Sequence, residues 1–149
     1  MNNLANMLNN EGLKIASLKK RIIAFILDNI IISTLILIYI LLNQDLKDNI
    51  EENMIIIQQY IFQLMLLQLI YHAFFTYYYG ASIGKIICKI AIISESTLNK
   101  PNIIQSINRS IFRIISDNIF MLGFVWSFLN IDRKTWHDYV AKTVVIELA

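Results

Sequence analysis

One stretch of the sequence, residues 19–42 (KKRIIAFILDNIIISTLILIYILL), limits most strongly what this chain can fold into. Three basic residues open it, and 21 largely apolar residues follow at positions 22–42. At about 1.5 Å of rise per residue, a helix of that length crosses the hydrocarbon core of a bilayer, which is about 30 Å thick. The sequence therefore predicts a first transmembrane helix at residues 18–42.

The composition of the whole chain agrees with a membrane location. Of its 149 residues 56% are hydrophobic and 16% are charged, against about 25% charged in ordinary soluble domains. A water-soluble core of this size cannot bury so much apolar surface, so we expect a single membrane domain covering residues 1–149. A cleaved signal peptide is the competing interpretation. Its apolar region would be too long and would contain Asp28, and no small-x-small cleavage site follows Leu42.

The distribution of charge predicts the orientation of the chain in the membrane. Residues 1–21 carry four basic residues and one acidic residue, whereas the loop at residues 43–53 carries four acidic residues and one basic residue. Because basic residues are enriched in cytoplasmic segments, we expect the N-terminus in the cytoplasm and this loop outside. Lys85 and Lys89 place the loop at residues 80–101 on the cytoplasmic side again. The net charge of +2 is too small to indicate a nucleic-acid partner.

The second predicted helix covers residues 54–79, which contain no formal charge. At about 100° per residue, four polar side chains fall in one sector of this helix. Polar side chains hydrogen-bond across transmembrane helices, so we expect protein as well as lipid against this sector. The four residues are Gln58, Gln68, His72 and Thr76.

The third helical region, residues 102–129, allows two geometries. Its first part has a polar stripe opposite a row of isoleucines, and its last 11 residues, 119–129, are apolar but too short to span a bilayer alone. The region forms either a third span or a re-entrant, interfacial helical hairpin. Residues 130–149 are predicted to be an interfacial tail on the cytoplasmic side.

The expected fold class is an all-α membrane protein. It has two transmembrane helices plus the hairpin or third span. In the hairpin geometry, the β-prone segments KIAIIS (residues 89–94) and TVVI (residues 143–146) can pair as a small two-stranded ribbon on the cytoplasmic side.

Asp28 is the first candidate functional residue, because a carboxylate within an apolar span costs about 2.5–3.5 kcal/mol on insertion scales. It either forms a structural pair with Arg21, Arg109 or Arg113, or it takes up protons or cations. Arg21 lies two helical turns before Asp28 on the same face, and it can also act as a positively charged anchor at the membrane boundary.

Two more titratable residues have a structural and a functional interpretation. His72 is either a hydrogen-bonded packing residue or a proton relay with Asp28. Asp138 is either a helix cap, or a salt-bridge partner of Arg133 or Lys142, or a gate residue on the cytoplasmic side.

No catalytic set or metal site is predicted. Residues 80–84 match the G-x-S-x-G pattern of hydrolases, but they follow a membrane helix and the chain has no room for the required α/β sheet. A tight turn at Gly80 and Gly84 that brings Lys85 to lipid phosphates fits this segment better. His72 and His137 lie in different segments, and no spacing matches a metal site. We expect no enzyme activity and no cofactor.

Taken together, these segments resemble the RDD family of small bacterial membrane proteins, over about residues 17–146. The resemblance rests on four stretches: KRIIAFILDNII, GASIGKIICKIAIIS, NRSIFRII and WHDYVAKTVV. Family members often have glycine where Cys88 and Lys142 stand, and arginine where Ala91 stands. The family positions fall on Arg21, Asp28, Gly80, Ser82, Gly84, Lys85, Arg109 or Arg113, His137, Asp138 and Thr143.

The resemblance implies a multi-pass protein of the bacterial inner membrane, in a family for which cation/proton antiport has been proposed for some members. Our first hypothesis is an ion-handling or transport-related protein with Asp28 as its intramembrane site. The alternative is a membrane scaffold or accessory subunit in which Arg21, Asp28 and Asp138 are structural locks between helices. The expected partners are membrane lipids and either further copies of the chain or a partner membrane subunit.

Overall fold

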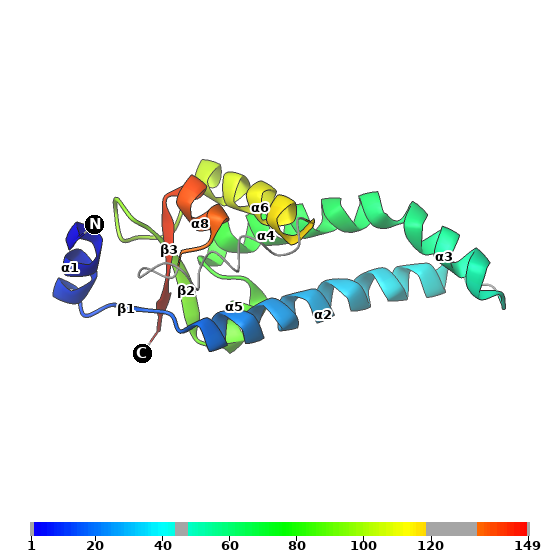
Figure 1. The fold of residues 1–149 in the computed structure, drawn as a ribbon, viewed down its shortest axis with the longest axis horizontal. Coiled ribbons are helices and arrows are strands. Elements are labelled where there is room, and N and C mark those ends of the chain that lie inside the picture. Colours follow the sequence, from blue (N-terminus) through cyan, green and yellow to red (C-terminus); the bar gives the residue numbers. More distant parts are fainter. Residues whose placement is uncertain (1, 44–47, 119–133, 149) are drawn as a thin grey trace.

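The computed structural model describes residues 2–43, 48–118 and 134–148, with side chains from residue 6 onward (Figure 1). A three-stranded sheet lies at one end of the molecule, together with both ends of the described chain. Two long helical segments extend from it toward the other end. The fold is mostly helical, as the sequence predicts.

Helix α2 spans Leu18–Leu42, the same bounds as the predicted first helix. Ser17 caps its N-terminus by accepting a hydrogen bond from the Lys20 amide. One face is buried, at positions three and four residues apart. Most of the remaining surface consists of exposed isoleucine and leucine side chains. By length and composition α2 can cross a membrane, and the low burial of its apolar side chains is unlike that of a core helix in a soluble protein. The buried residues are Arg21, Ala24, Asp28, Ile32 and Ile40.

The second helical segment differs from the single helix expected at residues 54–79. It consists of α3 (Ile50–Gln59) and α4 (Ile61–Tyr79), which are bent by 45° relative to each other. At the break, the amide of Tyr60 donates to the carbonyl of Ile57, three residues back, which is the tighter 3₁₀ pattern. Helix α4 ends at Gly80, whose left-handed φ of 71° lets the amide close the last turn on Thr76.

The sheet has the strand order β1-β3-β2, and both pairings are antiparallel. The predicted pairing of the segments at 89–94 and 143–146 is observed, as β2 (Ile90–Ser94) against β3 (Thr143–Glu147). The sheet has a third strand that the sequence did not predict, because β1 (Lys14–Ile15) pairs with the other edge of β3. Two residues are too short a strand to leave a periodic signal in the sequence.

Alternate residues of the sheet pack on opposite faces. Val145, Ile90 and Ile92 pack with Ala16, just before α2, and with Ala24 in its second turn. On the other face of the sheet, a second apolar cluster includes Leu8 from α1 (Asn2–Asn10). The sheet is therefore enclosed between α1 and the first turns of α2, which fixes the position of Arg21 next to β3. The second cluster consists of Leu8, Ile93, Val144 and Ile146.

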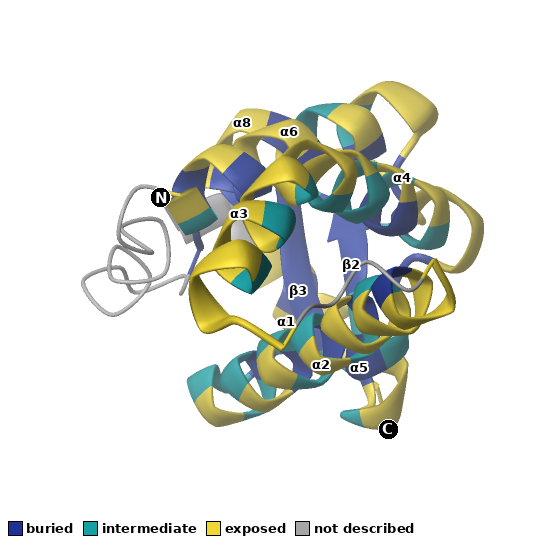
Figure 2. Cartoon of the chain, turned by 90° about the vertical axis from the view of Figure 1, so that its right-hand side faces the viewer, coloured by how far each residue is buried: buried dark blue, intermediate teal, exposed yellow. Residues whose placement is uncertain are grey.

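Helix α6 (Ile103–Asn118) has its polar side inward and its apolar side outward. Arg109 and Arg113 are buried, whereas Ile104, Ile107 and Ile111 on the opposite face are exposed. Figure 2 shows exposed residues along the outer side of α6. This arrangement is the reverse of a helix on a water-soluble protein and is expected where the surrounding solvent is lipid. The question of a third span or a hairpin at residues 102–129 falls mainly on residues 119–133, which lie outside the described residues.

Two short helices complete the site. Helix α5 (Ile83–Ile87) packs on α2 so closely that a Cβ on Gly84 would overlap the backbone carbonyl oxygen of Ala24. Helix α8 (Trp136–Ala141) begins with a capping box between Thr135 and Asp138. It ends at Lys142, whose left-handed φ of 50° explains why a glycine would fit this position.

We predict that Gly84→Ala lowers the free energy of unfolding by about 2–4 kcal/mol. The added methyl group pushes α5 away from α2 and lengthens the hydrogen bond from the Gly84 amide to Asp28. Thermal unfolding in detergent measures the loss, with Ile86→Ala as the control because Ile86 lies on the exposed side of the same helix. Equal unfolding temperatures for Gly84→Ala and the wild type would contradict the close packing of α5 on α2.

Candidate functional site

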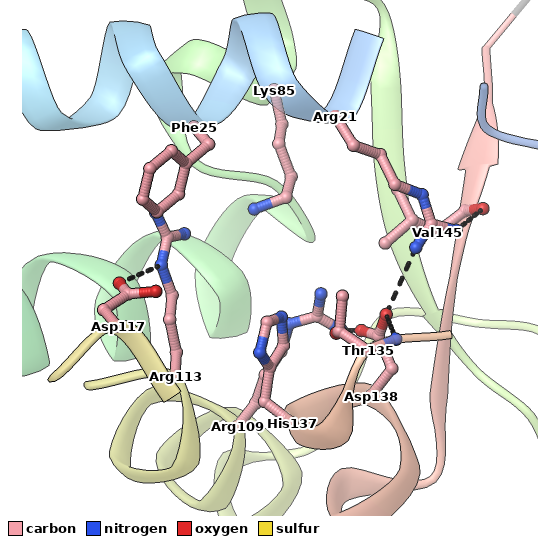
Figure 3. Close-up of a pocket in the computed structure, with 10 residues that line it drawn as sticks. All are labelled: Arg21, Phe25, Lys85, Arg109, Arg113, Asp117, Thr135, His137, Asp138 and Val145. Atoms are coloured by element: carbon pink, nitrogen blue, oxygen red, sulfur yellow. Dashed lines mark hydrogen bonds and ion pairs between the residues drawn. The ribbon is translucent and has the colours of Figure 1, made fainter. Parts of the chain in front are cut away.

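The buried charged residues gather around one small cavity of about 30 Å³ between α2, α5, α6 and α8 (Figure 3). Among the described residues, four cationic side chains from three of these helices and two carboxylates line it. The described lining residues are Arg21, Phe25, Lys85, Arg109, Arg113, Asp117, Thr135, His137, Asp138 and Val145.

Asp138 is the centre of one half of this cluster. Its fully buried carboxylate lies 2.6 Å from Arg109 Nη1 and 3.3 Å from Arg21 Nη1. Its Oδ2 also accepts a hydrogen bond from the Thr135 amide at 3.1 Å, which caps the N-terminus of α8. Burial alone raises the pKa of this carboxyl, but Arg109 above all, together with Arg21, holds it well below its usual range. Asp138 therefore stays ionised and joins α2, α6 and α8.

Both arginines also bind β3 and so connect the cluster to the sheet. Arg21 Nη2 donates to the carbonyl oxygen of Val145 at 3.2 Å, and Arg109 Nη1 donates to the hydroxyl of Thr143 at 2.6 Å. One of the two residues comes from the start of α2 and the other from the middle of α6. The sheet, the first long helix and the polar face of α6 are consequently held by the same set of charges.

Asp28 is the centre of the other half. Its Oδ1 accepts the Tyr71 hydroxyl at 2.9 Å and the Gly84 amide at 2.8 Å, and its Oδ2 accepts the Ser82 hydroxyl at 2.6 Å. Arg113 Nη1 lies 3.8 Å from Oδ2, a loose ion pair. Hydrogen bonds from α4 and from the segment around α5 thus stabilise a carboxylate that no solvent reaches.

Arg113 contacts several groups besides Asp28, the one partner that the sequence suggested for it. It lies 3.6 Å from Asp117, its guanidinium carbon is 5.3 Å from the centre of the Phe25 ring, and its Nη1 is 3.3 Å from His72 Nδ1. An arginine has no acceptor, so His72 accepts this hydrogen bond through an unprotonated Nδ1. The structure thus brings His72 to Arg113 rather than into a direct contact with Asp28.

Lys85 is buried and forms no ion pair within the described part of the chain. Its ammonium lies 3.4 Å from the Ser82 hydroxyl and points into the space between Arg113 and Arg109 (Figure 3). Burial first, and then the charge of Arg113, lower the pKa of Lys85 from 10.5 to about 7, although Asp28 acts in the opposite direction. This amine therefore gains and loses a proton near neutral pH.

The positions of Lys85 and the two glycines differ from the expected contact with lipid phosphates. The Lys85 side chain is 8% exposed and faces inward, because Gly84 brings α5 directly onto α2. Gly80 is also buried, and its carbonyl accepts the amide of Ile92 at 2.7 Å. These three residues connect α4, the sheet and the Asp28 carboxylate.

The remaining predicted site residues all lie in the cluster. Of the three arginines predicted as possible partners of Asp28, Arg113 forms the ion pair, whereas Arg21 lies against Asp138. Sequence reasoning did not identify Tyr71 or the inward position of Lys85. Nothing in the sequence marks Tyr71, because aromatic residues surround it, whereas the small residues Gly80, Ala81, Ser82 and Gly84 around Lys85 are a signal for close packing of this segment.

The geometry predicts strong energetic coupling between Arg109 and Asp138. Removing either partner leaves a buried charge with one partner fewer, at a cost of about 3–5 kcal/mol. The double variant Arg109→Met/Asp138→Leu should therefore be more stable than the sum of the single variants predicts, by about 1–3 kcal/mol.

Chemical or thermal unfolding of the four proteins measures this coupling. The matched control is the half-exposed pair Lys20–Glu147, whose Nζ and Oε2 atoms are 3.0 Å apart and whose coupling should be much weaker because solvent screens it. Additive effects of the Arg109 and Asp138 substitutions would contradict the observed ion pair.

Lys85 should titrate with a midpoint near pH 7, as seen by NMR of lysine-labelled protein in which Lys85→Met assigns the signal. Between pH 7 and 10.5 an unfolded Lys85 binds a proton that the folded chain releases. The free energy of unfolding should thus rise with pH across this window in the wild type, and less so in Lys85→Met. A Lys85 midpoint near that of the exposed lysines would contradict its burial.

Comparison with known proteins finds one family whose matched range covers most of the residues in this cluster. The sequence model of the RDD family matches residues 15–142, a range that includes α2, α4, α5, α6 and α8. No curated protein and no solved structure matches the chain. The match confirms the resemblance recognised in the sequence: this chain, with its apolar helix of membrane-spanning length, belongs to the RDD family.

Proposed function

We propose that this RDD-family chain is an ion-handling membrane protein that exchanges a monovalent cation for a proton at Asp28 and Lys85. The observation that carries the proposal is a chain of hydrogen bonds between these two residues. The Lys85 ammonium lies 3.4 Å from the Ser82 hydroxyl, which donates to Asp28 Oδ2 at 2.6 Å. A hydroxyl that both accepts and donates can pass a proton between the amine and the carboxylate.

The charge of the cluster supports this exchange. Four cationic side chains are buried together with the carboxylates of Asp28 and Asp138, and the partly exposed Asp117 adjoins them. The described cluster therefore carries a net charge of +1 that falls to zero when Lys85 releases its proton. A cation that binds beside Asp28 as the proton leaves restores the charge of +1. The two ions therefore compete, because holding both would leave an excess of buried positive charge.

Not every ion pair is available for exchange. Asp138 is held by two arginines, which do not lose their protons in proteins. In contrast, the Arg113–Asp28 pair is long, at 3.8 Å, and the carboxylate is otherwise bound by neutral donors. We assign the exchange to Asp28 for this reason and a structural role to Asp138.

The proposal also includes the orientation of the chain in the membrane and the partners that surround it. Lys14, Lys19 and Lys89 lie near the sheet end, and Glu51 and Glu52 begin α3 at the opposite end. This distribution favours a cytoplasmic N-terminus in the bacterial inner membrane, with more than one segment crossing. The exposed apolar faces of α2, α4 and α6 suit membrane lipids and homo-oligomer contacts or a partner membrane subunit.

A scaffold or accessory subunit is the second candidate function. The observation that favours it is that Asp138 connects three helices and, through Arg21 and Arg109, the sheet. In this alternative, Asp28 and Asp138 are both locks between helices.

We predict that purified protein in liposomes lets Na⁺ or K⁺ dissipate an imposed pH gradient. Ser82→Ala should slow this exchange about tenfold or more, because it interrupts the hydrogen-bonded chain while leaving both charges in place. Asp28→Asn should abolish it. The readout is a pH-sensitive dye trapped in the vesicles.

Lys19→Met is the matched control, since Lys19 is an exposed lysine at the start of α2 and should exchange at the wild-type rate. Thermal unfolding verifies that each variant is folded. Absence of exchange in the folded wild type would favour the scaffold function. Wild-type exchange in Ser82→Ala would remove Ser82 from the proton path.

A further inference from the structure

We propose that the cavity between α2, α5, α6 and α8 binds a small monovalent anion of the halide class, such as chloride. This site shares Lys85 with the proposed exchange but does not include Asp28 in its lining, and the inference holds whether or not the chain exchanges cations. It rests on the sign of the charge around the cavity, on unpartnered donors beside it, and on its size.

The lining of the cavity has an excess of positive charge. Arg21, Lys85, Arg109 and Arg113 face it, whereas Asp117 and Asp138 are its carboxylates. Asp138 is bound to Arg21 and Arg109, and Asp117 lies 3.6 Å from Arg113. The two carboxylates thus face four cations, and among these described cations Lys85 is the one that forms no ion pair. A bound anion would supply its counter-ion.

Donors beside the cavity lack hydrogen-bond acceptors. Arg113 is 7% exposed, and its buried Nη2 has no partner among the described residues. Lys85 can donate three hydrogen bonds and makes one, to Ser82. Figure 3 shows the Lys85 amine directed into the space beside the Arg113 guanidinium. A buried donor without an acceptor is costly, so the open space between these two cations is built for an acceptor rather than for a cation.

The size of the cavity restricts the anion. About 30 Å³ holds roughly two water-sized molecules, which also suits one halide ion. A phosphate or sulfate ion, with four oxygens around a central atom, needs more room, and a lipid headgroup needs more still. Size therefore selects a small anion from the anions that a positively charged cavity attracts.

Chloride titration of the purified full-length chain in detergent micelles tests the inference. The counter-anion gluconate keeps the ionic strength constant, and its bulk excludes it from the cavity. We expect ³⁵Cl NMR line broadening that added bromide reverses by competing for the site. We also expect an unfolding temperature that rises with chloride concentration and then saturates. Lys85→Met should weaken the affinity about tenfold or more, because it removes the cation that forms no ion pair with the described residues.

Lys19→Met, which changes an exposed lysine in the same way, should keep the wild-type affinity. If Lys85→Met does not fold, Lys85→Gln keeps a donor for Ser82 and should show the same loss. Equal behaviour in chloride and gluconate would overturn the inference and assign the cavity to water. Wild-type affinity in the folded Lys85 variant would place any chloride elsewhere, and tighter binding of sulfate or phosphate would overturn the halide class.

Discussion

The buried ion pairs of Asp138 with Arg21 and Arg109 are the interaction on which the rest of the structure depends. A carboxylate with no solvent exposure is stable only because two guanidinium groups and the Thr135 amide surround it. The same arginines donate to Val145 and Thr143 of β3, so the sheet cannot move without disturbing the pairs. The small sheet therefore positions the charges at the start of α2 and along α6, and the second set around Asp28 is built on that frame.

The membrane explains why this frame is charged at its centre. Helix α6 directs its isoleucines outward and its arginines and serines inward, which would be unstable in water. In lipid the outward isoleucines cost nothing, and the inward charges lower their free energy by pairing with each other. The same inversion accounts for α2, where Arg21 and Asp28 share the buried face and exposed isoleucines cover the rest. Such a core keeps polar groups dry and mutually bound, which is the environment that lowers the pKa of Lys85.

The sequence predicted those parts of the fold that have a local signal. The apolar run gave the bounds of α2, and the β-branched segments gave the pairing of β2 with β3. The polar stripe of α6 located Arg109 and Arg113, and the pair Arg113–Asp117 has helical i, i+4 spacing. No periodicity indicates that Arg109 meets Asp138 or that Arg113 meets Asp28, since these acids come from distant segments. The bend at Tyr60 has no proline or glycine to mark it, and the two-residue strand β1 is too short for a pattern. The inward direction of Lys85 depends on the close contact of Gly84 with α2, which appears only once the helices are packed.

Labelling of the native protein in bilayers with a lipid-soluble carbene reagent, mapped residue by residue by mass spectrometry, tests the inverted core most directly. The account predicts strong labelling along the isoleucine face of α6, at Ile104, Ile107 and Ile111, and protection of Ser110 and Arg113 on its other face. Equal labelling of both faces would contradict the account, because the charges could not then be packed together around Asp138 and Asp28.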